Sequence, residues 1–226
     1  MTDFNGFGPK TSKFLRELGR NNEKAWFDAH RADYEAHYLE PAKAFVEAAG
    51  PRVERFAPHI SWEPRVNGSL FRVNRDIRFS KDKTPYKDHI DLWFWEGDRK
   101  TALSGFYLRV RAMSVEFGVG AHRFSKEALL RYRESLTDDA AAKSLVSMIK
   151  RFERNGYRIF GKTYKQVPRG FVGGVAAQEL VLFSGLAAGA ERKSPPEIRS
   201  AKFLAYCSKE WKKLAPLHQW LMEHVG

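Results

Sequence analysis

The spacing of apolar residues changes twice along this 226-residue chain, and no other feature constrains its fold as strongly. In residues 9–56 and again in 196–225, apolar side chains recur every three or four positions, which is typical of amphipathic helices. Between residues 90 and 119 they are aromatic or β-branched and partly alternate, as in half-buried strands. This pattern predicts an α+β fold: a central antiparallel sheet with helices packed on it, and helical segments at the N-terminal and C-terminal ends.

Four short segments carry the strand-like pattern: 70–73, 90–95, 106–111 and 114–119. In the third, alternate residues divide into an apolar face and a face that carries Tyr107 and two arginines. Only two residues separate the third segment from the fourth. We therefore expect these two strands to form an antiparallel hairpin.

The second half of the chain is predicted to contain more helices. Ser125 is placed to cap a helix that ends near residue 136, and a further helix is expected over 137–154. The chain is then expected to return to helix over 176–186. The segment 187–195 looks most like a loop, because it is small, polar and ends at a proline. Pro216 is expected to divide the last helical stretch.

Composition indicates a globular protein. With 43% hydrophobic residues, the chain holds enough apolar material for a packed core, and we expect residues 1–226 to form a single domain. No apolar run reaches the ~18 to 20 residues that a membrane span requires. The N-terminus lacks the features of a secretory signal, so a cytoplasmic location is expected. The single cysteine, Cys207, excludes an internal disulfide.

The net charge of +12 is concentrated in the middle of the chain. Residues 65–171 contain 23 Lys and Arg against 12 Asp and Glu. A local excess of positive charge attracts phosphates, anionic metabolites or nucleic acid. The plainer alternative is a basic surface that serves only to keep the protein in solution.

The most distinctive stretch is residues 70–88, in which six cations accompany three carboxylates. Arginine offers a planar fork of donors that matches phosphate or carboxylate, and lysine offers a compact charge. We therefore predict an anion-binding, phosphate-directed pocket in which Asp76 and Asp82 orient the cations, and nucleic acid is the partner to test first. The predicted anion-binding residues are Arg72, Arg75, Arg78, Lys83 and Lys87, with Tyr86 and Tyr107 nearby.

Two other hypotheses fit the same residues. In an enzyme that acts on a small phosphorylated or carboxylated metabolite, the arginines would hold the substrate and Asp76 or Asp82 would be the catalytic base. In the third hypothesis, Arg–Asp pairs only fix loops and there is no ligand site. No cofactor is predicted, because the seven histidines form no metal-binding motif. A divalent metal held by aspartates is a minor alternative.

A second basic stretch, residues 150–171, interleaves cations with aromatic residues. Cations that alternate with aromatic rings can follow a phosphate backbone while the rings stack on bases. Aromatic residues at helix or strand spacing are more often part of a core, and the stretch by itself favours that interpretation.

The central motif, R-D-x-R-F-S-x-D-K-x-P-Y-K, begins at Arg75 and resembles that of a mainly bacterial family of conserved hypothetical proteins, domain of unknown function 2461. The resemblance extends from Phe14 to Phe171 and includes Lys24, Arg31 and other residues of the first 41. It implies a single unit with a shared central motif, and it carries no activity over to this chain. Gln166 stands where that family is expected to have a basic residue.

Overall fold

The computed structural model describes residues 3–226, and a six-stranded sheet lies at its centre. The strand order is β1-β2-β3-β4-β6-β5, and every neighbouring pair is antiparallel. This arrangement confirms the predicted α+β fold with a central antiparallel sheet. The strands are β1 (Ile60–Ser61), β2 (Ile90–Glu96), β3 (Gly105–Val110), β4 (Ser114–Ala121), β5 (Arg158–Lys162) and β6 (Phe183–Lys193).

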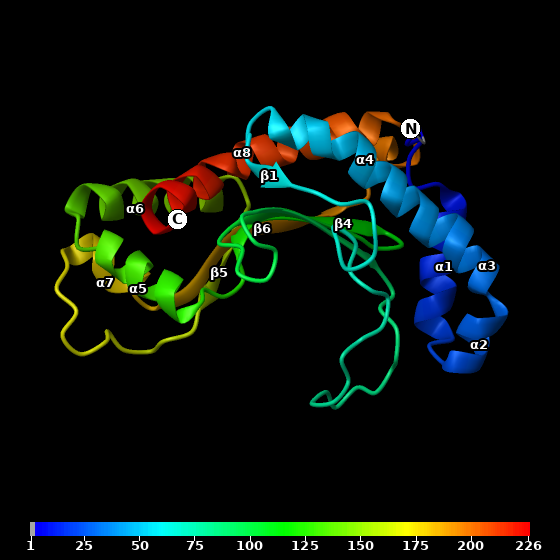
Figure 1. Ribbon diagram of the computed structural model, residues 1–226, viewed down its shortest axis with the longest axis horizontal. Helices are drawn as coiled ribbons and strands as arrows, with labels where there is room; N and C mark the ends of the chain where they lie inside the picture. The colour runs from blue at the N-terminus through cyan, green and yellow to red at the C-terminus, as the bar shows by residue number, and fades with distance from the viewer. Residues whose placement is uncertain (1–2) are drawn as a thin grey trace.

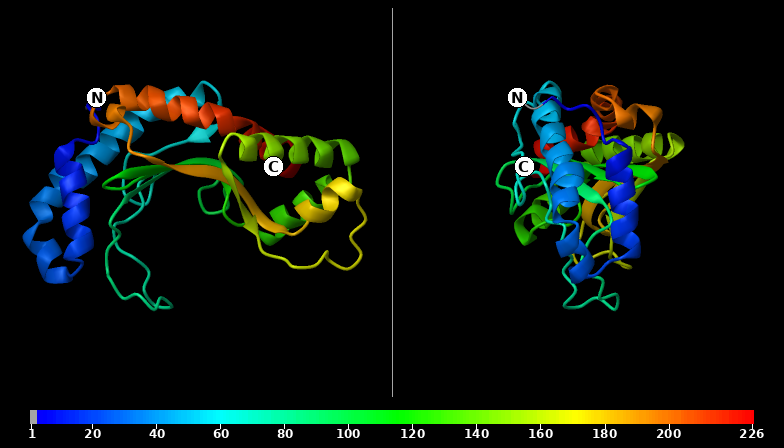
Figure 2. Two further views of the ribbon diagram at one scale, coloured as in Figure 1. Left: turned by 180° about the vertical axis from the view of Figure 1, so that it is seen from behind. Right: turned by 90° about the vertical axis from the view of Figure 1, so that its right-hand side faces the viewer.

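Helices lie at both ends of the sheet and along one of its faces (Figure 1). The N-terminal group consists of α1 (Pro9–Arg20), α2 (Lys24–Ala29), α3 (Arg31–Tyr34), a π-helical turn (Glu35–Leu39) and α4 (Glu40–Glu54). The others are α5 (Lys126–Ser135), α6 (Asp139–Arg154), α7 (Val175–Leu180), a 3-10 turn (Pro196–Arg199) and α8 (Lys202–Val225). The N-terminal group extends to the same side of the sheet as α5 and α7, so the molecule has the outline of an arch with α8 along its top (Figures 1 and 2).

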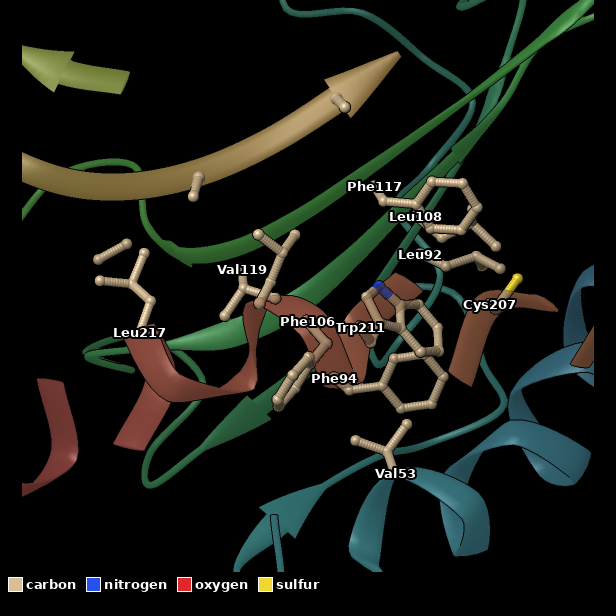
Figure 3. Packing of buried hydrophobic residues seen from close by; sticks show 14 of the residues in the cluster. Val53, Leu92, Phe94, Phe106, Leu108, Phe117, Val119, Cys207, Trp211 and Leu217 are labelled. Carbon is tan, nitrogen blue, oxygen red and sulfur yellow. The ribbon is translucent and has the colours of Figure 1, made fainter. Parts of the chain in front are cut away.

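The core lies between α8 and one face of the sheet (Figure 3). Trp211 of α8 packs against Phe94, Phe106 and Phe117 from three adjacent strands, with ring centroids 5.4, 6.3 and 6.5 Å away. Its indole N–H donates to the backbone carbonyl of Tyr107 at 3.0 Å, so the one polar atom of the buried ring has a partner. Each such side chain contributes about 1.5 to 3 kcal/mol by leaving water.

Strand alternation leaves the opposite face of the sheet polar. Buried and partly exposed residues alternate strictly along β4, as the sequence pattern of the middle region predicts. The register places Tyr107 opposite Trp93 and Arg109 opposite Asp91, on the face away from α8. In the views of Figures 1 and 2 this face lies on the inner side of the arch.

The largest error of the sequence analysis concerns residues 176–195. Helix α7 ends at Leu180, and the expected loop is part of β6, an interior strand between β4 and β5. The composition misled because the middle of this strand, residues 185–190, is glycine and alanine at every position but one, and both residues are depleted in strands. Small residues are needed here: a Cβ on Gly189 would lie 2.3 Å from the carbonyl oxygen of Phe117 on the neighbouring strand.

Two smaller expectations are also wrong. Residues 70–73 do not form a strand, because only an isolated bridge joins Leu70 to Leu92 of β2. Pro216 does not divide the last helix, since α8 continues through it from Lys202 to Val225. A buried apolar stripe that runs the length of α8 holds the helix together, and this packing outweighs the loss of one backbone hydrogen bond at the proline.

Candidate functional site

The central motif of the sequence forms a loop that projects from the sheet (Figure 1). A bridge between Asn74 and Tyr86 closes its base. Two backbone hydrogen bonds reinforce it, from Arg75 N to Pro85 O and from Lys87 N to Val73 O, both 2.8 Å long. We refer to residues 75–85 as the motif loop.

The N-terminal helices hold the base of the motif loop in place. The side-chain amide of Asn22 donates to the carbonyl of Tyr86 and accepts from its backbone N–H, both at 2.9 Å. The ring of Tyr86 stacks on Phe27 of α2 with 4.2 Å between centroids. The predicted site residue Tyr86 is therefore buried and serves to anchor the loop.

Within the motif loop, arginines pair with aspartates. Arg78 donates two hydrogen bonds to the carboxylate of Asp76, at 2.9 and 2.7 Å. Arg75 donates to Asp82 at 2.6 Å. Hydrogen bonds from the Arg78 side chain and backbone lower the pKa of Asp76 to about 2. Those from the backbone and hydroxyl of Thr84, and then from Arg75, lower the pKa of Asp82 to about 2 as well.

These pairs are exposed to solvent. The side chains of Asp76 and Asp82 are 48% and 61% accessible, so their attraction to the arginines is weakened by water and salt. Carboxylates with a pKa of about 2 are weak bases at neutral pH, which makes a catalytic role for Asp76 or Asp82 harder to achieve. Lys83 is also engaged, since its ammonium group donates to the carbonyl of Ile77 at 2.9 Å.

Arg72 differs from the other arginines of the motif. It lies just before the loop and lines a cavity of about 320 Å³ between the N-terminal helices and the chain around residues 66–86. Within residues 3–226 its side chain has no hydrogen bond or ion pair. We refer to this space as the Arg72 cavity. Its other charged and aromatic lining residues include Lys24, Phe27, Asp28, Arg31 and Tyr86.

The Arg72 cavity carries more positive than negative charge. Both Lys24 and Arg31 pair with the same carboxylate, that of Asp28, which Arg31 approaches at 3.8 Å. The charged residues that line the cavity are therefore three cations, Lys24, Arg31 and Arg72, and one carboxylate, that of Asp28. Sequence reasoning missed Lys24 and Arg31 as site residues, because they lie more than 40 positions from Arg72 and only the fold brings them together.

Lys87 and Tyr107 belong to a different place, a buried network on the polar face of the sheet. At its centre is Asp91, which is 5% exposed. Its carboxylate accepts hydrogen bonds from the hydroxyl of Tyr107 at 2.5 Å and from Arg109 Nε at 2.7 Å. His89 Nε2 and Lys87 Nζ lie 3.3 and 3.4 Å from its other oxygen.

The surroundings of Asp91 keep it ionised. Burial raises the pKa of Asp91, but hydrogen bonds from His89 and Arg109 outweigh it, and the pKa lies well below its usual range. Burial, together with the negative charge of Asp91, raises the pKa of Tyr107. Because four groups converge on this carboxylate, it binds the protein's own side chains together and has little capacity left for a ligand.

The motif was predicted to converge on one pocket, and the structure distributes its residues among three surroundings. Arg75, Arg78 and Lys83 have partners inside the exposed loop, Lys87 and Tyr107 belong to the Asp91 network, and Arg72 lines the cavity.

A scan against family models gives a match to a conserved hypothetical protein family (DUF2461) over residues 10–220. The chain belongs to the DUF2461 family. The resemblance inferred from the central motif is thereby confirmed.

A search of curated proteins found no match to this DUF2461 chain. Among its described residues, 3–226, no group of three or more His, Cys, Asp or Glu side chains is placed to hold a metal ion. No helix in the same range combines the length and the apolar character that crossing a membrane requires.

Sequence analysis of this DUF2461 chain also missed a buried Ser–His–Glu arrangement. Nδ1 of His218 lies 2.9 Å from the hydroxyl of Ser104, and its Nε2 lies 2.9 Å from Glu96. The order of groups resembles that of a hydrolase triad, but Ser104 is completely buried and does not line the Arg72 cavity. Burial lowers the pKa of His218, so the imidazole is neutral and joins α8 to the sheet.

Proposed function

We propose that this protein binds a phosphate-bearing ligand in the Arg72 cavity and that nucleic acid is the first partner to test. The observation that carries the proposal is the state of Arg72: it lines a cavity with two other cations and forms no salt bridge within residues 3–226, so that its charge acts on the nearby Asp76 only at longer range. A guanidinium fork in such a position can donate hydrogen bonds to two oxygens of one phosphate.

The lining of the cavity fits a phosphate ester better than a bare ion. Phe27 and Tyr86 form an aromatic wall beside the cations, with their rings stacked on each other. Arg31 lies over the ring of Phe27 at 5.1 Å, which orients its guanidinium group. An apolar wall next to a positively charged cluster can hold the sugar or base of a nucleotide while the cations bind its phosphate.

The paired arginines of the motif loop have a supporting part in this proposal. Arg75 and Arg78 are paired with the carboxylates of Asp82 and Asp76, so they add less positive charge than the sequence suggested. Their pairs are exposed, and a phosphate group can compete with an aspartate for an exposed arginine. We therefore expect these two residues to strengthen binding at low salt and to contribute little at high salt.

The test is a binding titration of tripolyphosphate and of a fluorescein-labelled dT15 oligonucleotide over a range of salt concentrations. We expect Arg72→Gln to weaken binding of both about tenfold and to reduce the salt slope for dT15 by about one. The matched control is Arg52→Gln, which removes an exposed arginine on α4 that does not line the Arg72 cavity. Absence of binding at low salt, or equal affinities for the two variants, would overturn the proposal.

A further inference from the structure

Within residues 3–226, three aromatic side chains have more than a third of their surface exposed, and each of them lies beneath an arginine. Phe79, Phe160 and Tyr164 are 95%, 36% and 39% exposed. Their arginine neighbours are Arg78 at 5.8 Å, Arg158 at 5.4 Å and Arg133 at 5.0 Å from the respective ring centroids. A single exposed apolar residue needs no explanation. In residues 3–226, however, every exposed aromatic ring is paired with an arginine, and this repeated pairing calls for an explanation.

The three pairs lie on one side of the molecule. Phe79 is near the tip of the motif loop, and this loop and the segment 163–174 both extend away from α8 (Figures 1 and 2). Phe160 lies on the edge strand β5, just before the segment 163–174; its register partner is Ala187, and Arg158 is paired with Gly189. Both residues therefore share the polar face of the sheet with Arg109 and Tyr107.

We infer that the ligand of this protein is single-stranded nucleic acid, which runs from the motif loop along the inner side of the arch to the segment 163–174. The inference rests on the proposed function and extends it. Aromatic rings stack on unpaired bases, whatever their identity, and neighbouring arginines follow the phosphates. A guanidinium group over one face of a ring does not prevent a base from stacking on the opposite face.

The dimensions of the motif loop support contact with several nucleotides. Phe79 is five residues from the loop's base at Asn74, so its ring lies up to ~17 Å from the backbone next to the Arg72 cavity. At that full extension, Phe79 and the Arg72 cavity would contact different nucleotides of one strand. We therefore expect a short oligonucleotide to engage one contact and a longer one to engage several.

An anionic membrane is the main rival ligand, because exposed apolar tips beside cations also bind lipid headgroups. The arrangement favours nucleic acid. Phe160 lies on a strand of the sheet rather than on a projecting tip, and a bilayer surface cannot enter an arch to reach it. A flexible single strand can follow the polar face of the sheet.

The experiment compares Phe79→Ala and Tyr164→Ala with Leu130→Ala, a control that removes a 60% exposed leucine from α5. The probes are labelled dT15, the matching 15-base-pair duplex, tripolyphosphate and vesicles rich in phosphatidylserine. We expect each aromatic variant to weaken binding of dT15 about tenfold, with tripolyphosphate unchanged and dT15 favoured over the duplex. Phe79→Trp should bind dT15 as tightly as the wild type does. The fluorescence of the added tryptophan should be quenched by dT15 but not by tripolyphosphate.

The outcomes separate this inference from the proposed function. If tripolyphosphate and dT15 bind and depend on Arg72, but Phe79→Ala and Tyr164→Ala behave like Leu130→Ala, the proposed function stands and the inference is wrong. Equal affinity for duplex and single strand also overturns it. Vesicle binding that Phe79→Ala abolishes, without loss of dT15 affinity, assigns the aromatic residues to a membrane instead. If neither phosphate probe binds, both proposals fail.

Discussion

Two clusters of arginine and aspartate in this protein have the same chemistry and opposite surroundings. In the motif loop, Asp76 and Asp82 are about half exposed, and each is held mainly by one arginine and by nearby groups of the loop. On the polar face of the sheet, Asp91 is almost fully buried and four side chains converge on it. Composition alone does not distinguish the two clusters, and burial determines what each can do.

The buried cluster is committed to the fold. Its charged groups are buried away from water. Their contacts with one another compensate for the cost of desolvation only while every partner is present. The exposed cluster keeps most of its hydration, so its pairs contribute little to stability and can exchange partners. For this reason we assign ligand binding to the exposed cations and to the Arg72 cavity, and structural support to Asp91.

The largest effect is expected from Asp91→Asn. This change leaves Lys87, His89 and Arg109 around a neutral amide, and removal of one partner from a buried ionic network costs about 3 to 5 kcal/mol. Urea denaturation followed by tryptophan fluorescence measures the free energy of unfolding. Asp98→Asn, at an exposed loop position, is the control. A loss for Asp91→Asn no larger than that of the control would show that the network is not structural.

A smaller effect is expected from the buried imidazole. The folded-state pKa of His218 is lowered by burial, so below about pH 6.5 the unfolded chain binds a proton that the folded chain excludes. Stability should therefore fall as the pH drops from 7 toward 5, by at most about 1.4 kcal/mol per pH unit. His218→Gln should flatten this part of the Tm profile, although it lowers Tm at pH 7.

His122→Gln, which changes an exposed histidine, should leave the shape of that profile unaltered. If the His218→Gln profile keeps the wild-type slope between pH 5 and 7, the buried histidine is not its source. Glu96 and Ser104 are the groups that face the imidazole, and both variants retain them. The comparison therefore isolates the histidine.

The sequence predicted the parts of the fold that depend on periodicity. Strands β2, β3 and β4 follow from alternation, and the division of β3 into an apolar face and a face with Tyr107 and Arg109 agrees with the observed burial. Strand β6 was missed because its glycine and alanine residues carry no alternation signal. Its identity depends on contact with β4 and β5, which is tertiary information.

The candidate site was only partly predictable for a related reason. Arg72 was identified because it lies within a basic run, but nearness in sequence also grouped it with Lys87, which turns toward Asp91. Lys24 and Arg31 were not selected, because they lie on short helices far from the motif in sequence. Asn22, which joins those helices to the motif loop at Tyr86, gives no signal of that contact in sequence.

A modest gain in affinity is expected from Asp28→Asn. Asp28 is the carboxylate that both Lys24 and Arg31 contact in the Arg72 cavity, so its charge opposes an incoming phosphate. Neutralising it should tighten tripolyphosphate binding about twofold to fivefold, as measured by calorimetry. Asp33→Asn, on the neighbouring helix and outside the cavity lining, should change affinity less. Weaker binding in Asp28→Asn would mean that the aspartate orients the cations and does not compete with the ligand.

The smallest effect on stability is expected from Asp76→Asn, the counterpart of Asp91→Asn in the exposed cluster. The pKa of Asp76 is lowered to about 2 by its hydrogen bonds with Arg78. A lowered pKa gives stability that is fully present above the unfolded value of about 3.9 and is lost as the pH falls toward 2. Between pH 5 and 8, the Tm profiles of Asp76→Asn and the wild type should therefore run parallel. Because water screens this exposed pair, the two profiles should also nearly coincide.

Any small difference between these two profiles should shrink below about pH 4, where the wild-type carboxyl becomes protonated as well. Arg78, once freed, should meanwhile strengthen binding of dT15 at low salt, because its charge is no longer neutralised. A fall in Tm comparable to that of Asp91→Asn would mean that the motif loop depends on its ion pairs as the sheet does. Exposure would then not distinguish the two clusters, and the supporting part proposed for Arg75 and Arg78 in ligand binding would be wrong.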